Sequence, residues 1–254
     1  MRRSLPRENT CKVGAKGLSY FDLVTLKEFK GGFGWHQRIK HDLKELASLF
    51  LLKGITKVVS AAGKLGLEVL NWRPYESAKL AIKFSPLPNV VLILLFTYNE
   101  EFGANANIFL ERRMLGYIPT EEAVGLEEVL IDALSFLLTH EEERSAVETL
   151  PIEGKRRDIL LMLPEQILKE SVIHLKGSIS LSSRERWETI FQPFPILRMV
   201  IKRDGSSVTV TFTSHTPLPG TLLRNLAWLY CNAILREARR IDNTIPPISN
   251  NLLP

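Results

Sequence analysis

Apolar and polar residues along the chain follow two different periods. Residues 36–51, 120–138 and 222–239 each place apolar side chains three or four positions apart, as one buried face of an α-helix requires. Residues 80–84 instead alternate apolar and polar side chains, which is typical of a strand with one wet face. The stretch 90–98 is apolar on both faces and predicts a covered strand in the middle of a sheet. Helices and hairpin strands together predict an α+β fold.

A proline-rich pattern occurs twice. Phe84-Ser-Pro-Leu-Pro88 and Phe191-Gln-Pro-Phe-Pro195 each precede an apolar strand, and a tight turn, a second strand, a proline-bearing loop and a helix follow in the same order. The sequence therefore predicts two similar helix/antiparallel-hairpin/helix repeats with a pseudo-twofold relation. The first turn is longer in the first copy and carries Glu100 and Glu101, whereas the second copy has a minimal Asp204-Gly205 turn.

These patterns divide the chain into five segments. A short helix is predicted over residues 20–29, and Pro164 is expected to kink or split the helix that begins at Asp158. The predicted segments are a flexible N-terminus at 1–17, a first α+β repeat at 18–140, a charged linker at 141–157, a second α+β repeat at 158–241 and a C-terminal tail at 242–254.

Composition narrows the class of protein only modestly. The chain has 254 residues, 24% of them charged, and a formal net charge of +5 that is diffuse rather than clustered, so nucleic acid is an unlikely partner. Cys11 and Cys231 are too few and too far apart for a disulfide framework, and we interpret them as free thiols in a reducing cytoplasm. The longest apolar run, at 90–96, is far shorter than a membrane span, so no membrane is predicted. Scarce Gln and Cys beside many charged residues fits a heat-adapted source.

The acidic turn is the first candidate for chemistry. Glu100 and Glu101 could meet a cation, a basic partner or a proton-transfer step, or they could simply make a hairpin tip soluble. Because neighbouring strand residues point to opposite faces, the two carboxylates are not expected to share one metal. No metal site is predicted, and any cofactor is unknown from the sequence.

Basic residues supply a second candidate. Arg112 and Arg113, with Arg38 and Lys40, could form a site for an anion, although such residues are more often a solvated rim. We take Glu100, Glu101, Arg112 and Arg113 as the candidate ligand-binding residues. No catalytic residues can be assigned, because no histidine has a serine or cysteine nucleophile in a recognisable setting.

The same stretch carries a resemblance to a known family. Leu87–Val90 with the apolar strand after it, the turn Asn99–Phe102, the segment 106–109, and Tyr117–Glu121 before a helix resemble an uncharacterised prokaryotic domain-of-unknown-function family (DUF3786-like) over roughly residues 48–140. Several members of that family resemble C-terminal partners of small cysteine-rich iron–sulfur domains. This chain has no four-cysteine domain, so the resemblance implies a fold and an accessory role rather than a cluster.

Three classes of function follow. The first is a cytoplasmic binding or accessory protein that acts through protein–protein contact or through an anionic ligand held between the two repeats. The alternatives are an enzyme whose inter-repeat cleft uses the acidic and arginine residues, or a weak nucleic-acid binder. Whether the protein is an enzyme is left open by the sequence.

Overall fold

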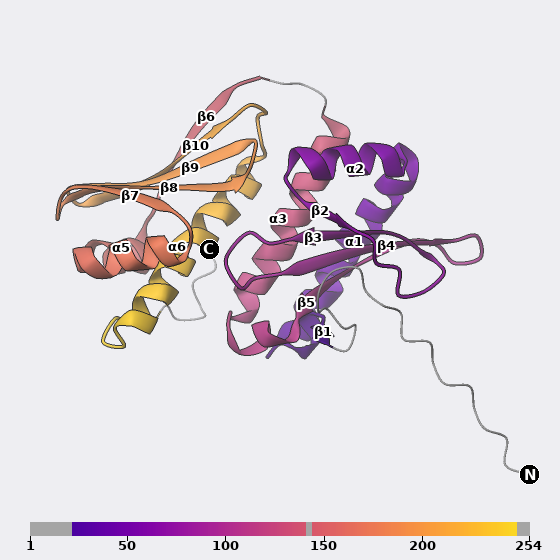
Figure 1. Ribbon diagram of the computed structural model, residues 1–254, viewed down its shortest axis with the longest axis horizontal. Helices are drawn as coiled ribbons and strands as arrows, with labels where there is room; N and C mark the ends of the chain where they lie inside the picture. Colours follow the sequence, from indigo (N-terminus) through magenta and orange to yellow (C-terminus); the bar gives the residue numbers. More distant parts are fainter. Residues whose placement is uncertain (1–21, 141–143, 248–254) are drawn as a thin grey trace, which may run out of the picture.

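A computed structural model describes residues 22–140 and 144–247. It contains two antiparallel sheets at either side of the molecule, with helices α3 (Thr120–Thr139) and α6 (Gly220–Ile241) running side by side between them (Figure 1). The α+β class predicted from the sequence is therefore confirmed. No single helix in the described ranges is long and apolar enough to cross a membrane; only the pair α1 (Gly32–Lys53) and α2 (Ile55–Lys64), bent by 113°, passes such a test together.

The first half begins with a very short strand and ends with α3. Its sheet has the order β1-β5-β4-β3-β2, all antiparallel. Helix α1 packs against β5, α2 against β2, and both against α3. The remaining elements are β1 (Leu23–Val24), a 3₁₀ turn η2 (Leu26–Glu28), β2 (Glu68–Leu70), β3 (Ala78–Phe84), β4 (Leu92–Asn99), β5 (Gly103–Glu111) and a 3₁₀ turn η3 (Arg112–Gly116).

The second half repeats this order of elements. Its sheet has the order β6-β10-β9-β8-β7, and α5 and α6 pack against each other. Its other elements are β6 (Ala146–Pro151), α4 (Gly154–Met162), α5 (Glu165–His174), β7 (Ser178–Ser183), β8 (Arg186–Phe194), β9 (Leu197–Asp204) and β10 (Ser207–Ser214). Each half thus reads strand, two helices, four-stranded meander, helix, and its first strand joins the sheet beside the last. A pseudo-twofold axis between the halves stays a prediction.

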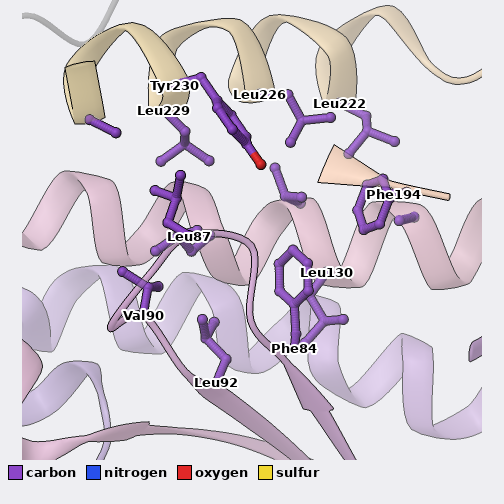
Figure 2. Close-up of a cluster of buried hydrophobic side chains, with 14 of the residues drawn as sticks. Phe84, Leu87, Val90, Leu92, Leu130, Phe194, Leu222, Leu226, Leu229 and Tyr230 are labelled. Carbon is purple, nitrogen blue, oxygen red and sulfur yellow. The ribbon is translucent and has the colours of Figure 1, made fainter. Parts of the chain in front are cut away.

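The two halves share one hydrophobic core. Buried side chains of both sheets and of α1, α3 and α6 form a continuous cluster, and side chains from both halves interlock around the loop after β3 (Figure 2). The rings of Phe84 and Phe194 stack at 5.6 Å between centroids. The hydroxyl of Tyr230 on α6 donates a hydrogen bond to the carbonyl oxygen of Pro86 at 2.8 Å. At these positions, packed side chains from both halves therefore fill the space between them.

A second, smaller cluster covers the other face of the first sheet. It includes Trp72, Ile93 and Leu95, so β4 is buried on both faces as its sequence predicts. The split at Pro164 is also found, because α4 ends at Met162 and α5 begins at Glu165.

Three local predictions are wrong. The charged linker predicted at 141–157 contains β6 and the start of α4, because the alternating residues of β6 complete the sheet beside β10. The short helix predicted at 20–29 is strand β1 followed by the η2 turn. Leu51, predicted on the buried face of α1, is 52% exposed. The flexible N-terminus predicted at 1–17 and most of the tail predicted at 242–254 lie outside the described residues.

The two Phe-x-Pro-x-Pro patterns do not occupy equivalent places. The first begins where β3 ends, with Phe84 paired to Leu92 at the start of β4. In the second half, the residue paired to the start of β9 is Phe194, which faces Leu197, and Phe191 lies inside β8. The pattern therefore lies at the same strand-to-strand connection in both halves, but in the second half it begins three residues earlier relative to the end of the strand.

Candidate functional site

The acidic turn lies at the tip of the β4–β5 hairpin. Glu100 and Glu101 are both exposed there, and the side-chain oxygen of Asn99 accepts a hydrogen bond from the backbone N–H of Glu101 at 2.7 Å. This Asx turn fixes the backbone of the tip and leaves the two carboxylates in solvent.

The predicted arginines lie at the opposite end of the same strand. Arg112 and Arg113 open the η3 turn directly after β5, and the guanidinium of Arg113 pairs with the Glu111 carboxylate. Strand β5 runs from Gly103 to Glu111, and a rise of about 3.4 Å per residue separates its ends by about 27 Å. The structure therefore does not bring the predicted glutamates and arginines into one site. It gives no support to an enzyme site that combines them.

Arg38 and Lys40, the other basic residues considered for an anion site, differ in their surroundings. The Arg38 guanidinium pairs with the Glu128 carboxylate of α3 and lies 5.0 Å above the Trp35 ring, so it fastens α1 to α3. Lys40, two residues further along α1, is exposed. With Lys44 one turn later, it stands on one face of the helix, as the four-residue spacing requires.

These two lysines line a groove of about 550 Å³ at the tip of the hairpin. The rest of the lining comes from the end of β4, the turn, the start of β5 and the residue before β3, and it holds neutral polar side chains, one aromatic ring and no carboxylate. The lining residues are Lys40, Lys44, Ser77, Thr97, Asn99, Phe102, Gly103, Ala104 and Asn105. Phe102 is 81% exposed, an unusual position for a large ring. The groove therefore offers two positive charges, amide and hydroxyl groups, and an apolar contact.

The groove also borders an incompletely paired strand. Strand β5 pairs with β4 from Gly103 to Leu110, but on its other side β1 reaches only Leu110 and Glu111. Among the described residues, the stretch from Gly103 to Ile108 thus has no ladder partner on that side. Gly103, Ala104 and Asn105 belong both to this open edge and to the groove.

The most buried charged groups lie elsewhere, between α3 and α6. Arg236 of α6 pairs with the buried carboxylate of Glu122 and stands over the Tyr117 ring, while Arg240 pairs with Glu237 at 3.0 Å. Burial raises the pKa of Glu122, and the Arg236 charge opposes that rise. This cluster joins α3 of one half to α6 of the other, so we assign it to the packing of the halves.

Two further buried groups, the Glu127 carboxyl and the Cys231 thiol, are poorly suited to catalysis. Burial raises the pKa of the Glu127 carboxyl well above its ordinary value of 4.5, and the nearby Glu128 charge adds to the rise. Among the described residues, one oxygen of Glu127 has no hydrogen-bond partner. Burial likewise raises the pKa of the free Cys231 thiol to about 12. A neutral acid in the core and a buried thiol are poor candidates for catalysis at neutral pH. Within residues 22–140 and 144–247, no group of three or more His, Cys, Asp or Glu side chains could hold a metal ion.

The part of the chain that contains the groove is similar to an uncharacterised domain family. Residues 15–133 match the domain of unknown function DUF3786. The match confirms the resemblance carried by the hairpin motifs and begins earlier in the chain than the expected residue 48. No curated protein matches the chain.

The matching residues 15–133, the DUF3786 segment, contain every residue that lines the groove. It extends from before β1 into α3, so it also includes the open edge of β5 and both lysines. The second half, from β6 to α6, lies outside the match. The DUF3786 segment therefore carries the groove, and the second half supplies a second sheet and α6 packed against it.

Sequence reasoning found some of the residues of this site. It singled out the turn at Asn99–Phe102 and named Lys40, but it paired them with Arg112 and Arg113. It did not single out Lys44 as a ligand-binding residue. The signal that could have connected them is the apolar stripe of α1, since it orients the opposite, lysine-bearing side toward solvent; that this side meets the hairpin tip depends on tertiary packing.

Proposed function

We propose that the protein is an accessory binding protein that holds an anionic segment of a partner protein in the groove between α1 and the β4–β5 hairpin. The observation that carries the proposal is the lining of the groove, which contains Lys40 and Lys44 and no carboxylate. Two ammonium groups one helical turn apart attract paired negative charges, and their long stems allow them to follow a flexible ligand.

The neighbouring polar groups support a macromolecular segment rather than a deeply enclosed small molecule. Side chains of Ser77, Asn99 and Asn105 in the lining provide hydrogen-bonding groups, and the exposed ring of Phe102 provides an apolar contact. Interfaces between proteins commonly combine an exposed aromatic anchor with a polar surround. The groove belongs to one half, so the proposal differs from the expectation of a ligand held between the repeats.

A direct titration tests this function. We expect a fluorescent oligoglutamate peptide to bind the wild-type protein at low salt, and Lys40→Glu/Lys44→Glu to weaken that binding about tenfold or more, since two charge contacts contribute about 1–2 kcal/mol together. The matched control is Lys155→Glu/Lys169→Glu, which makes the same change of charge at exposed sites on α4 and α5. Fluorescence anisotropy measures the affinity of each variant.

Two results would contradict the proposal. One is the absence of peptide binding to the wild-type protein at low salt. The other is an equal loss in the groove variant and in the α4/α5 control, which would show that net charge alone attracts the peptide. An oligonucleotide that bound more tightly than the peptide, with the same dependence on Lys40 and Lys44, would replace a protein partner by nucleic acid.

A further inference from the structure

The two hairpins β4–β5 and β9–β10 differ at their tips. In β4–β5 the residues beyond the last strand pair are Glu100, Glu101 and Phe102, whereas in β9–β10 they are only Gly205 and Ser206. The second hairpin shows that such a connection closes with two small residues and without a ring or a carboxylate. Closing the chain therefore does not account for the three larger side chains at the first tip.

The Phe102 ring is held at the groove although most of it meets water. Its side chain is 81% exposed and lines the groove together with the two lysines of α1. The backbone on either side of it is fixed, because the Asn99 side chain accepts a hydrogen bond from the N–H of Glu101 at 2.7 Å and Gly103 takes a φ of +73°. Since the tip is already ordered, an apolar side chain placed on this ring removes apolar surface from water without the cost of ordering a loop.

The two carboxylates make the hairpin side of the groove unfavourable for an anion. Glu100 and Glu101 immediately precede Phe102, are exposed and do not belong to the lining. Consecutive Cα atoms are about 3.8 Å apart, and charges act over about 10 Å at 0.1 M salt, so both carboxylates repel an acidic group that touches the ring. The α1 side, with Lys40 and Lys44, attracts the same group. The two sides of the groove therefore prefer different side chains.

We propose that the partner segment held in the groove has two faces: its acidic side chains contact Lys40 and Lys44, and an apolar side chain beside them packs on the Phe102 ring. This inference rests on the proposed function and specifies the class of partner. Glu100 and Glu101 act in selection, since they keep acidic side chains away from the ring and direct them to α1. Specific sites commonly combine an attractive element with a repulsive one in this way.

The charges and the size of the site favour such a segment over other occupants. A wholly acidic segment would bring some of its charges against Glu100 and Glu101, and a basic one would meet the two lysines. An anionic bilayer would lay its headgroups over the whole tip, whereas a peptide can present its acids on one side only. A second copy seated through its own three-residue tip would bury far less than the roughly 800 Å² per partner of a stable interface.

Two peptide series of equal charge test the contact with the ring. In the first series, each glutamate of a fluorescent heptaglutamate peptide is replaced in turn by leucine; in the second, it is replaced by serine. We expect at least one leucine peptide to bind wild type about fivefold or more tighter than its serine counterpart, and Phe102→Ser to remove that difference. Met162→Ser, which changes a side chain that is 66% exposed at the end of α4, is the control and should keep the difference. Fluorescence anisotropy at low salt measures each affinity.

Neutralising the acidic turn tests its role in selection. We expect Glu100→Gln/Glu101→Gln to bind the all-glutamate peptide about threefold or more tighter than wild type does, and so to narrow the preference for leucine, because the repulsion beside the ring is removed. Glu165→Gln/Glu185→Gln is the control, since it makes the same change of net charge at exposed sites on α5 and in the β7–β8 turn. An equal gain in both double variants would overturn the selective role of the acidic turn, because it would show that net charge alone acts.

The outcomes separate this inference from the proposed function. If leucine and serine peptides bind equally at every position while binding still requires Lys40 and Lys44, charge alone holds the partner, so the two-faced segment is wrong and the binding function stands. If no peptide binds wild type at low salt, the proposed function fails as well.

Three further results would overturn the inference alone. A preference for leucine that persists in Phe102→Ser would place the apolar contact away from the ring. Binding to phosphatidylserine vesicles that is tighter than to any peptide and is lost in Phe102→Ser would make a membrane the occupant. Self-association of wild type that Phe102→Ser abolishes, measured by sedimentation, would make a second copy the occupant.

Discussion

At the scale of single residues, the environment of a side chain decides its role more than its type does. Lys40 is exposed in the groove, whereas Arg38, two positions earlier, is engaged with Glu128. Glu122, in the first turn of α3, is buried against Arg236. Thr120 is the first helical residue of α3, and its hydroxyl donates a hydrogen bond to the carbonyl oxygen of Lys30 at 2.8 Å. Such roles depend on neighbours that sequence spacing does not identify.

Replacing a buried acid gives a prediction with a definite pH dependence. Burial raises the pKa of Glu127 in the folded protein, so above its ordinary pKa of 4.5 the unfolded chain loses this proton while the folded chain keeps it. The stability therefore falls as pH rises above about 4.5 toward the folded-state pKa. We expect Glu127→Gln to be more stable than wild type at pH 8 by roughly 1–3 kcal/mol, and by less at pH 5.

Urea unfolding at the two pH values measures this difference. Glu185→Gln is the control, since Glu185 is exposed in the turn between β7 and β8 and should change stability little at either pH. A Glu127→Gln variant less stable than wild type at both pH values would contradict the prediction, because it would mean that the carboxylate is ionised and compensated in the core.

A glycine at the contact between the halves gives a second prediction. Gly66 has φ of +67°, and a Cβ there would lie 2.7 Å from Cγ of Pro195. Gly103 has φ of +73°, but a Cβ there would meet nothing within 4 Å. Both alanine substitutions are expected to cost about 1 kcal/mol of backbone strain, and Gly66→Ala a further 1–3 kcal/mol of overpacking.

Thermal unfolding of both variants and of Gly66→Ala/Pro195→Ala measures these costs. Removing the proline ring should recover the overpacking cost, so the double variant is expected to be less destabilised than the sum of its single changes. Equal losses in Gly66→Ala and Gly103→Ala would show that the two halves do not approach as described.

At the scale of elements, hydrophobic period predicted the long helices and the two hairpins but not the edge strands. The stripes of α1, α3 and α6 and the two-faced β4 are strong patterns, since each buries many apolar side chains. Strands β1 and β2 are two and three residues long, too short for a period to be seen. Strand β6 lies in a charged stretch, where its short alternation was not recognised as a strand that pairs with β10.

The aromatic pair across the halves provides the element-scale prediction. Phe84 and Phe194 stand at the ends of β3 and β8, are 2% and 1% exposed, and stack with their planes 15° apart. Each Phe→Leu change should cost stability by itself, and the double change should cost less than the sum by roughly 0.5–1.5 kcal/mol. Chemical denaturation of the four proteins of this cycle measures the coupling, and additivity within error would show that the two rings do not interact.

At the scale of the whole molecule, the two halves have the same order of elements, and the pseudo-twofold repeat stays a prediction. The two halves share a continuous core through α3 and α6, and the segment expected to be a linker contributes a strand to the second sheet. The family match ends within α3 at residue 133. The DUF3786 segment thus depends on α6 for some of its packing, which no pattern within that segment reveals.

A shared core predicts a single unfolding transition. Exposing the first half would strip Phe194 and Tyr230 of their contacts, so neither half is expected to unfold alone. Differential scanning calorimetry should give one transition whose calorimetric and van't Hoff enthalpies agree. Two resolved transitions would contradict this prediction, because they would show that the two halves unfold independently.

The central claim, that the DUF3786 segment holds an acidic partner at Lys40 and Lys44, is tested most directly by exchanging the charges on both sides. The measurement is the affinity of an acidic peptide and of its lysine-substituted counterpart for wild type and for Lys40→Glu/Lys44→Glu, by fluorescence anisotropy at one low ionic strength. The account predicts that wild type prefers the acidic peptide and that the variant prefers the basic one, each by about tenfold or more. An unchanged preference for the acidic peptide in the variant would contradict the claim, because it would place the binding site away from the groove.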